Sequence, residues 1–314
     1  MQIHLGGNHM FLLQLMQFGP AAAGLLLAAG AHWLTRRYGV ALPARVRAST
    51  AVGMILTVIA AVVFSAWWVY PWWVPAMVDW LVYVQLSRFL IPLVLTVVPL
   101  AFLAIPARSE KRVGTAELAP RTVMTFTSRG RLIGTAIVTL LAVVVAIVAG
   151  AASTTDEAGR HVMFELPISE NTTASTTIYG WWYSLPCLAV LLLLLLLTAL
   201  VLRGISLPPL SADRVADSAQ RATRTRNVLA ALSGGLLLHL GVVLVSLYGT
   251  STMRTELSAG ASGQVQFGTS FAALGSFFQV SGYACFVLAF AFWGSVLLST
   301  LAASSRRLAT SSAR

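Results

Sequence analysis

The positively charged residues of this chain lie in every second gap between its long apolar segments. Eighteen of the 21 Lys and Arg residues fall in these alternate gaps. In a membrane protein, the loops that carry an excess of Lys and Arg remain on the cytoplasmic side. The pattern therefore predicts an all-α integral membrane protein with its N-terminus outside and its C-terminus in the cytoplasm.

The composition agrees with a lipid environment. Hydrophobic residues make up 57% of the chain and charged residues 10%, whereas a soluble domain is about one quarter charged. A net charge of +11 in a soluble protein would suggest nucleic acid, but here the cations flank apolar segments and face an anionic inner leaflet. We expect a multi-pass protein of the plasma membrane with no nucleic-acid partner, and the strong preference for Arg over Lys suggests a bacterial source.

Seven apolar segments are long enough to cross about 30 Å of hydrocarbon at about 1.5 Å per residue. The predicted spans are 11–34, 51–70, 81–105, 132–152, 181–202, 228–248 and 271–301. The outer loops are then 153–180 and 249–270, and the inner loops are 35–50, 106–131 and 203–227. A six-span alternative stays open, because Gly19 and Pro20 weaken the first segment, which could lie flat on the membrane surface.

The second half of the chain contains an internal similarity. Residues 128–203 resemble residues 223–307, and in this alignment Arg129 and Arg131 match Arg224 and Arg226. Each unit would contain two spans, so a duplication would be parallel, with one leading helix followed by three hairpins. Chance similarity between apolar sequences is the alternative.

Both outer loops contain a short segment in which polar and apolar residues alternate. The segment from His161 to Ile168 has the pattern of a strand, and the segment from Gln264 to Phe267 could pair with it as a small cap over the outer face. The alternative is that both are irregular surface loops.

Arg88 is a cation inside a predicted span, on a helix that also carries Gln85 and Pro92. A guanidinium at that depth needs an anion, a carbonyl group or water. Pro92 removes the N–H that would bond the Arg88 carbonyl, so a kink is expected there. Arg88 is therefore either an anion contact in an outward-facing cavity or a structural or snorkelling arginine. Its candidate partners are Asp79, Glu165 and Glu170.

His239 and two cysteines are the other reactive side chains within the spans. His239 lies in the middle of its span, where it could carry protons, ligate haem or bond across helices. Cys187 and Cys285 could form a disulfide or remain two buried thiols. No cofactor is predicted, because the residues that could form an external copper site have no fixed spacing. These weak candidates are His4, His9, Met10, His161 and Met163.

The inner segment 211–227 has the charge order of a helix. Asp217 lies in an early turn, while Arg221 and Arg224 lie further along, which suits the helix dipole. Such a helix could dock on a cytoplasmic ATPase through Arg214, Asp217, Arg221 and Arg224. It could equally be the solvated start of the next span.

Three hypotheses of function follow. No Asp or Glu lies inside a predicted span and the chain has no phosphate-binding Gly-rich motif, so active transport would need a partner. The first hypothesis is a membrane-embedded subunit of a multicomponent transport system, an ABC-type permease that uses a separate ATPase for an amphipathic or lipidic compound. The second is a non-transporting accessory, sensor or scaffold subunit, and the third is an intramembrane redox or haem protein. We expect no catalytic activity under the first two.

Overall fold

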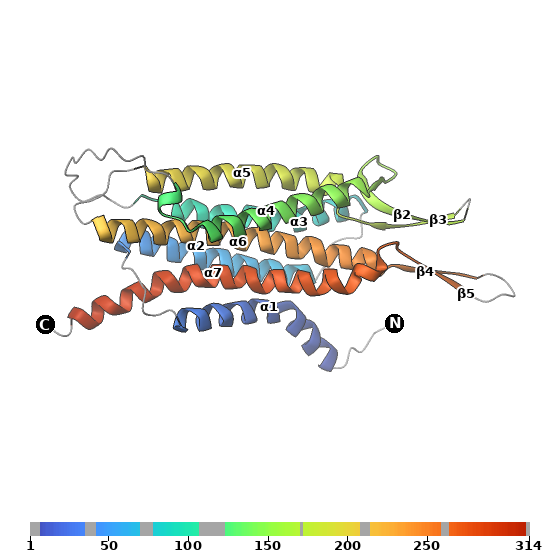
Figure 1. Ribbon diagram of the computed structural model, residues 1–314. Helices are drawn as coiled ribbons and strands as arrows, with labels where there is room; N and C mark the ends of the chain where they lie inside the picture. The colour runs from blue at the N-terminus through green and yellow to red at the C-terminus, as the bar shows by residue number, and fades with distance from the viewer. Residues whose placement is uncertain are drawn as a thin grey trace.

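The computed structural model describes residues 7–34, 42–69, 78–106, 123–169, 172–207, 214–258 and 264–311. Its helices lie side by side in one elongated bundle, and two β-hairpins project from one end (Figure 1). The helices are α1 (Gly7–Leu34), α2 (Ala44–Val69), α3 (Val78–Leu103), α4 (Arg129–Ala151), α5 (Trp181–Ser206), α6 (Arg214–Ser251) and α7 (Gly275–Ser311). Two 3-10 turns, Val123–Thr125 and Ala272–Leu274, precede α4 and α7.

Six of these helices are long and apolar enough to cross a membrane, which confirms the all-α membrane fold. The apolar part of α1 within the described residues, Phe18–Leu34, is shorter. It nevertheless packs closely along α7, because a Cβ added at Gly24 would lie 2.3 Å from the Val287 carbonyl oxygen. Helix α1 is therefore part of the bundle.

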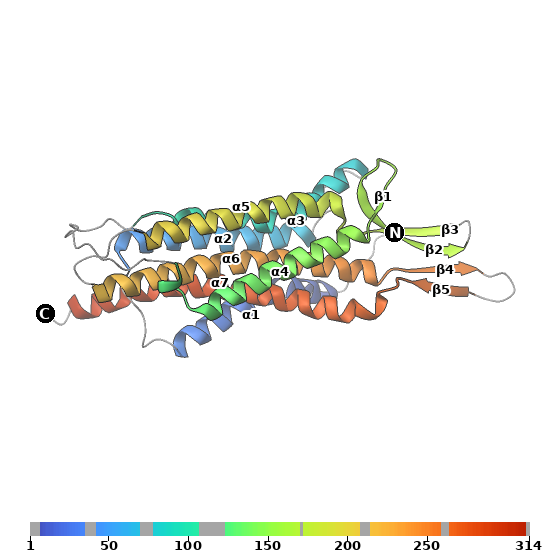
Figure 2. The same ribbon diagram turned by 45° about the horizontal axis from the view of Figure 1, so that its top comes forward.

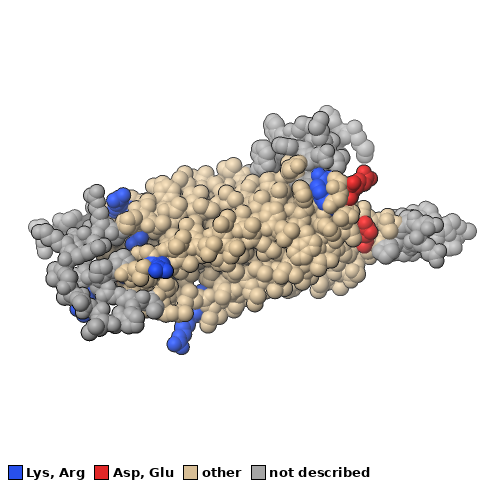
Figure 3. Space-filling view, turned by 90° about the horizontal axis from the view of Figure 1, so that it is seen from above, with Lys and Arg blue, Asp and Glu red and all other residues tan. Residues whose placement is uncertain are grey.

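Charge separates along the bundle. Most visible Lys and Arg side chains gather at the end where α4 and α6 begin, and the Asp and Glu side chains visible on this face lie at the end that carries the hairpins (Figure 3). We name these the inner and outer ends, following the expected retention of cations in the cytoplasm. Helix α1 begins at the outer end and α7 ends at the inner end.

Helix α6 forms the core of the bundle. Of its most apolar stretch, 89% is buried inside the protein. Glycines allow its neighbours to approach closely: a Cβ at Gly235 would lie 1.6 Å from the Thr96 hydroxyl oxygen, and one at Gly234 would lie 2.4 Å from Trp293 Nε1. The Trp293 indole donates a hydrogen bond of 3.0 Å to the Ala231 carbonyl. Small residues thus set the contacts of α6, as is usual where helices pack in membranes.

The outer loops form two separate antiparallel sheets. One contains β1 (Thr154–Thr155), β2 (His161–Ser169) and β3 (Thr172–Thr177) in that order, and the other contains β4 (Arg254–Ser258) and β5 (Gln264–Gly268). The predicted strand at 161–168 is confirmed, and the alternative of irregular loops is wrong. The predicted pairing of 264–267 with this strand is also wrong, because each strand pairs with its neighbour in sequence, for which loop closure costs less entropy. The first sheet contacts the segment that follows β5, where the rings of Phe164 and Phe271 lie 5.1 Å apart.

The order of elements agrees with the predicted internal similarity. A helix, a hairpin and a returning helix occur first as α4, β2–β3 and α5, and again as α6, β4–β5 and α7. Helices α4 and α6 run in the same direction (Figure 1), and the hydroxyl oxygens of Thr135 and Ser233 lie 3.0 Å apart between them. The two units therefore contact each other through matched helices.

The inner segment 211–227 is not a separate helix. Helix α6 is continuous from Arg214 to Ser251, so the segment is the start of the next span. The sequence suggested that this start would be solvated, but Arg221 and Arg224 are buried. Residues 208–213 lie outside the described part of the chain.

Candidate functional site

Two arginines near the start of α6 reach the inner ends of two neighbouring helices. Arg221 and Arg224 lie one turn apart, and their exposed fractions are only 7% and 9%. Burial of a guanidinium is costly unless its N–H groups find acceptors. The acceptors in this case are carbonyl groups at the ends of α5 and α3.

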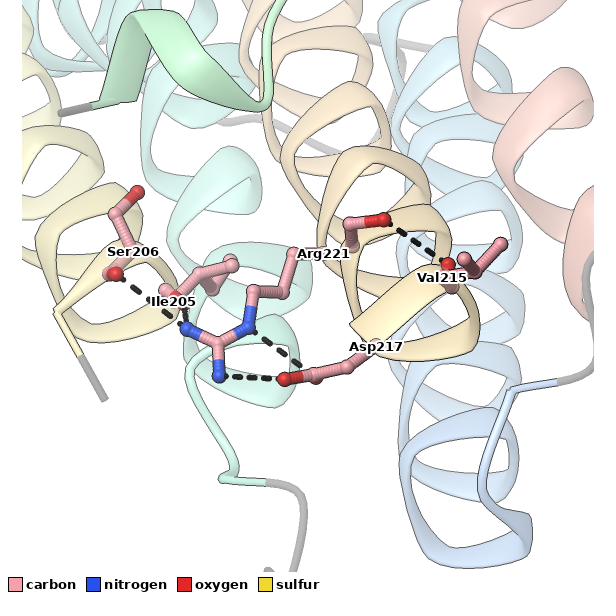
Figure 4. Close-up of polar contacts among 6 residues, drawn as sticks. Ile205, Ser206, Val215, Asp217 and Arg221 are labelled. Carbon is pink, nitrogen blue, oxygen red and sulfur yellow. Dashed lines mark hydrogen bonds and ion pairs between the residues drawn. The ribbon is translucent and has the colours of Figure 1, made fainter. Parts of the chain in front are cut away.

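Arg221 binds the end of α5 and an acidic residue of its own helix (Figure 4). Its Nη2 and Nε donate to the two carboxylate oxygens of Asp217 at 2.9 and 3.2 Å. Its Nη1 donates to the carbonyls of Ile205 and Ser206 at 3.1 and 3.4 Å. Carbonyls in the last turn of a helix lack intrahelical donors and carry the negative end of its dipole. Arg221 therefore caps α5 and neutralises Asp217 at the same time.

Arg224 makes the corresponding contact with α3. Its Nη2 donates to the carbonyls of Leu103 and Ile105 at 3.2 and 2.9 Å, where α3 ends. Its Nε is buried and has no hydrogen-bond partner among the described residues. Together, Arg221 and Arg224 fasten the inner ends of α5 and α3 to α6, and we call this pair the arginine clamp.

The clamp bears on the predicted docking of an ATPase. Asp217, Arg221 and Arg224 are engaged inside the chain, whereas Arg214 is exposed at the start of α6. Its neighbour Val215 is 80% exposed. Docking stays a prediction, and Arg214 with Val215 offers the accessible surface for it.

His239 links three parts of the core. Its Nδ1 lies 2.9 Å from the Phe89 carbonyl of α3. A carbonyl only accepts, so Nδ1 carries the proton, and in the neutral ring Nε2 is then an acceptor. Nε2 lies 3.5 Å from the Tyr179 hydroxyl, which comes from the segment before α5. Both ring nitrogens are thus engaged by protein groups, which favours the cross-helix interpretation over haem ligation.

Arg88 lies beside this link on α3. Its side chain is half-buried, with the guanidinium carbon 5.8 Å from the centre of the Phe89 ring. Gln85, one turn earlier, is also half-buried, and Glu165 is exposed on β2. The side chain of Asp79 and the whole of Glu170 lie outside the described part. Both interpretations of Arg88 stay predictions.

The two cysteines are free thiols. Cys187 is buried and Cys285 is half-buried, and neither is bonded to the other. The alternative of two thiols is therefore the one that the structure shows.

The weak metal candidates do not form a site in the described part of the chain. His161 Nδ1 lies 3.3 Å from the Ser153 carbonyl, and Met163 packs against the hydrophobic core. His4 and the side chains of His9 and Met10 lie outside the described part. Among the described residues, no three His, Cys, Asp or Glu side chains are grouped as a metal site would require.

An ionic turn holds the first outer sheet. The carboxylate of Asp156 accepts from the backbone N–H groups of Ala158 and Arg160 at 3.0 and 2.8 Å, and from Arg160 Nε at 2.8 Å. Gly159 closes the turn with a φ of +74°. Desolvation raises the pKa of Asp156, but the hydrogen bonds and the charge of Arg160 outweigh it and hold that pKa below its ordinary value.

Sequence reasoning did not identify Tyr179, Ile205 or Leu103 as contacts of the candidate residues. Tyr179 stands just before the aromatic pair Trp181 and Trp182. This pattern suggests a membrane interface, so it gives no sign of the buried hydrogen bond between Tyr179 and His239. The other two residues act through backbone carbonyls, which the sequence does not mark. Comparison with protein-family models, curated proteins and solved structures finds no match to this chain, so its function is argued from its own geometry.

Proposed function

We propose that the chain is a non-transporting scaffold subunit of a complex in the plasma membrane of a bacterium. The observation that carries the proposal is the enclosure of α6, whose most apolar stretch is 89% buried. A transport path through this bundle would pass along its axis. That axis is filled by α6 and by the large side chains packed on it, of which Phe89, Tyr179 and Trp293 are at most 1% exposed.

The outer hairpins support a role in assembly. They project beyond the helices in both ribbon views (Figure 2), and the β4–β5 sheet contains two strands. A two-stranded hairpin is at best marginally stable alone, and its unpaired edges can accept another strand. An outer partner that pairs with such an edge would stabilise it.

Thiol labelling tests whether α6 is enclosed. In a background with Cys187→Ser and Cys285→Ser, we introduce Leu236→Cys or Val243→Cys, at positions that are 0% and 1% exposed. Neither variant should react with a charged, water-soluble thiol reagent in intact membranes. Val215→Cys, at an 80% exposed position, should react from the inner side and is the matched control. Reaction at the two central positions as fast as at the control would reveal a water-filled path and contradict the proposal.

Isolation from native membranes tests whether the chain has partners. Mild cross-linking followed by native gel electrophoresis should show the chain in a larger complex, with partners identified by mass spectrometry. A stable monomer under the same conditions would contradict a scaffold role.

A transport subunit with a separate ATPase is the second candidate. It is favoured by the inner end of α6, which continues past the apolar stretch to exposed Arg214 and Val215. Copurification of a nucleotide-hydrolysing subunit, lost in Arg214→Glu, would favour this candidate. Arg88→Gln separates the roles of that residue: loss of ligand binding at unchanged stability would indicate a binding site, and loss of stability alone would indicate a structural arginine.

A further inference from the structure

Two arginines at matched positions of the internal similarity converge at the inner end. The contact between Thr135 and Ser233 holds α4 and α6 side by side in the same direction. Arg131 lies one turn before Thr135, and Arg226 lies two turns before Ser233. Each arginine is therefore on the face of its helix that makes this contact. Arg131 is close enough to Arg226 for their positive charges to repel each other.

This pair differs from the arginine clamp in its partners. Within the described residues, neither guanidinium of Arg131 and Arg226 has a hydrogen bond or an ion pair. Asp217, the described acidic residue on this part of α6, is already bound by Arg221. Two adjacent cations repel each other, and Arg226 is half-buried, which reduces the screening by water. An anion between them would turn this repulsion into attraction.

Residues next to the pair in the sequence carry further polar groups without partners. The side chain of Ser128 makes no capping hydrogen bond at the start of α4, so the first N–H groups of that helix lack a side-chain acceptor. The hydroxyl groups of Thr127 and Thr225 are buried and have no partner among the described residues. A Cβ at Gly130 would meet nothing within 4 Å, so there is open space beside this helix end. The first turn of α4 therefore adds N–H groups without a side-chain acceptor, and the positive end of a helix dipole, to the two guanidinium groups.

The side of α4 next to this contact is apolar and exposed. Gly134 is exposed one turn after Arg131, and Leu141 and Val148 follow on the same side of the helix, where they are 48% and 63% exposed. The two guanidiniums thus lie where the polar region meets the hydrocarbon, at the depth of lipid phosphates. A ligand that fits both parts has an anionic phosphate and an acyl chain.

From these observations we infer that Arg131 and Arg226 bind the phosphate of an anionic phospholipid of the inner leaflet. The planar forks of two guanidiniums match the oxygens of one phosphate group. The acyl chains of the lipid lie along the exposed face of α4.

Lipid titration of the full-length chain tests the inference. The purified protein in a neutral detergent is titrated with fluorescent phosphatidylglycerol and, separately, with fluorescent phosphatidylcholine. Phosphatidylglycerol should bind more tightly, and the double variant Arg131→Gln/Arg226→Gln should lower its affinity by about tenfold or more. The variant Arg131→Lys/Arg226→Lys keeps both charges but loses the planar guanidinium groups. Its affinity for phosphatidylglycerol should therefore lie between that of the original chain and that of the double Gln variant. Thermal unfolding verifies that each variant is folded.

The control removes a different cation from the same end. Arg203 is exposed on the last turn of α5, and Arg203→Gln should leave the affinity for phosphatidylglycerol within about twofold of the original. Millimolar inorganic phosphate should not displace the lipid. The inference is overturned if the double Gln variant binds phosphatidylglycerol normally, if Arg203→Gln weakens binding equally, or if inorganic phosphate competes as well as the lipid does.

Discussion

Helices α4 and α6 have matched sequences and run in the same direction, yet they occupy opposite environments. The most apolar stretch of α6 is 89% buried in the protein, whereas that of α4 is 22% buried. Hydrophobicity does not separate them, because lipid and the protein interior are both apolar. They differ in the packing of their central residues. Gly234, Gly235 and His239 of α6 are in close contact with its neighbours, while a Cβ at Gly134 of α4 would meet nothing within 4 Å.

Glycine substitution should break this comparison most strongly. Gly235→Ala places a methyl group against buried Thr96, so the helices must separate and stability should fall by about 3 kcal/mol. Gly134→Ala meets open space and should raise stability by about 0.5 kcal/mol. Equilibrium unfolding in mixed micelles measures both changes. Equal effects of the two substitutions would show that α6 is not enclosed.

Removal of the matched arginines should give a smaller but still unequal effect. Arg224→Gln deletes buried, charge-assisted hydrogen bonds to α3 and should cost about 2 kcal/mol, with faster amide exchange at the end of that helix. Arg129→Gln removes an exposed cation from a helix N-terminus and should leave stability within about 0.5 kcal/mol. A similar loss of stability in both variants would contradict the conclusion that Arg224, and not its counterpart Arg129, caps a neighbouring helix.

The polar link in the middle of α6 sharpens the comparison further. His239→Leu leaves the Phe89 carbonyl and the Tyr179 hydroxyl without this partner and should cost about 1 to 2 kcal/mol. Tyr179→Phe removes only the longer contact of 3.5 Å to the ring and should cost about 0.5 kcal/mol. Unfolding measurements on both variants and on the double variant give the coupling energy. No coupling between the two sites would show that the link is not formed.

The smallest effect on stability is expected at Asp156, in the exposed turn that follows α4. The pKa of Asp156 in the folded protein lies below its ordinary value of 3.8, so its contribution to stability is present above that pH and is lost as the pH falls further. Asp156→Asn should therefore lower the melting temperature slightly at pH 7, and the difference from the original chain should vanish in strong acid. A difference that persists at low pH would assign the effect to packing.

The helices could be predicted from the sequence because apolar length is a strong and local signal. Their inner ends were less predictable. Helix α6 begins at Arg214 rather than at the first apolar residues near 228, because its polar first turns are held by contacts with α3 and α5. Those contacts depend on which helices are neighbours, and a pattern of hydrophobic residues does not encode that choice when every helix is apolar on all sides.

The candidate site was predictable in part for the same reason. A polar residue is easily recognised inside an apolar span, so His239 could be identified from the sequence. Its partner is a backbone carbonyl, which every residue carries, so Phe89 could not be identified. Arg221 and Arg224 were misleading because arginines in an inner loop usually face water, whereas these two cap neighbouring helices.

The continuity of α6 has a mechanical consequence. Its 38 residues span about 57 Å, well beyond the hydrocarbon thickness, so one rigid rod reaches both sides of the membrane. The rod is gripped at its inner end by the ends of α3 and α5, and at its outer end Thr250 donates to the Thr177 carbonyl of the first sheet. Because α6 is also packed closely along its length, as at Gly234 and Gly235, a rotation of this helix would disturb the contacts at both of its ends together.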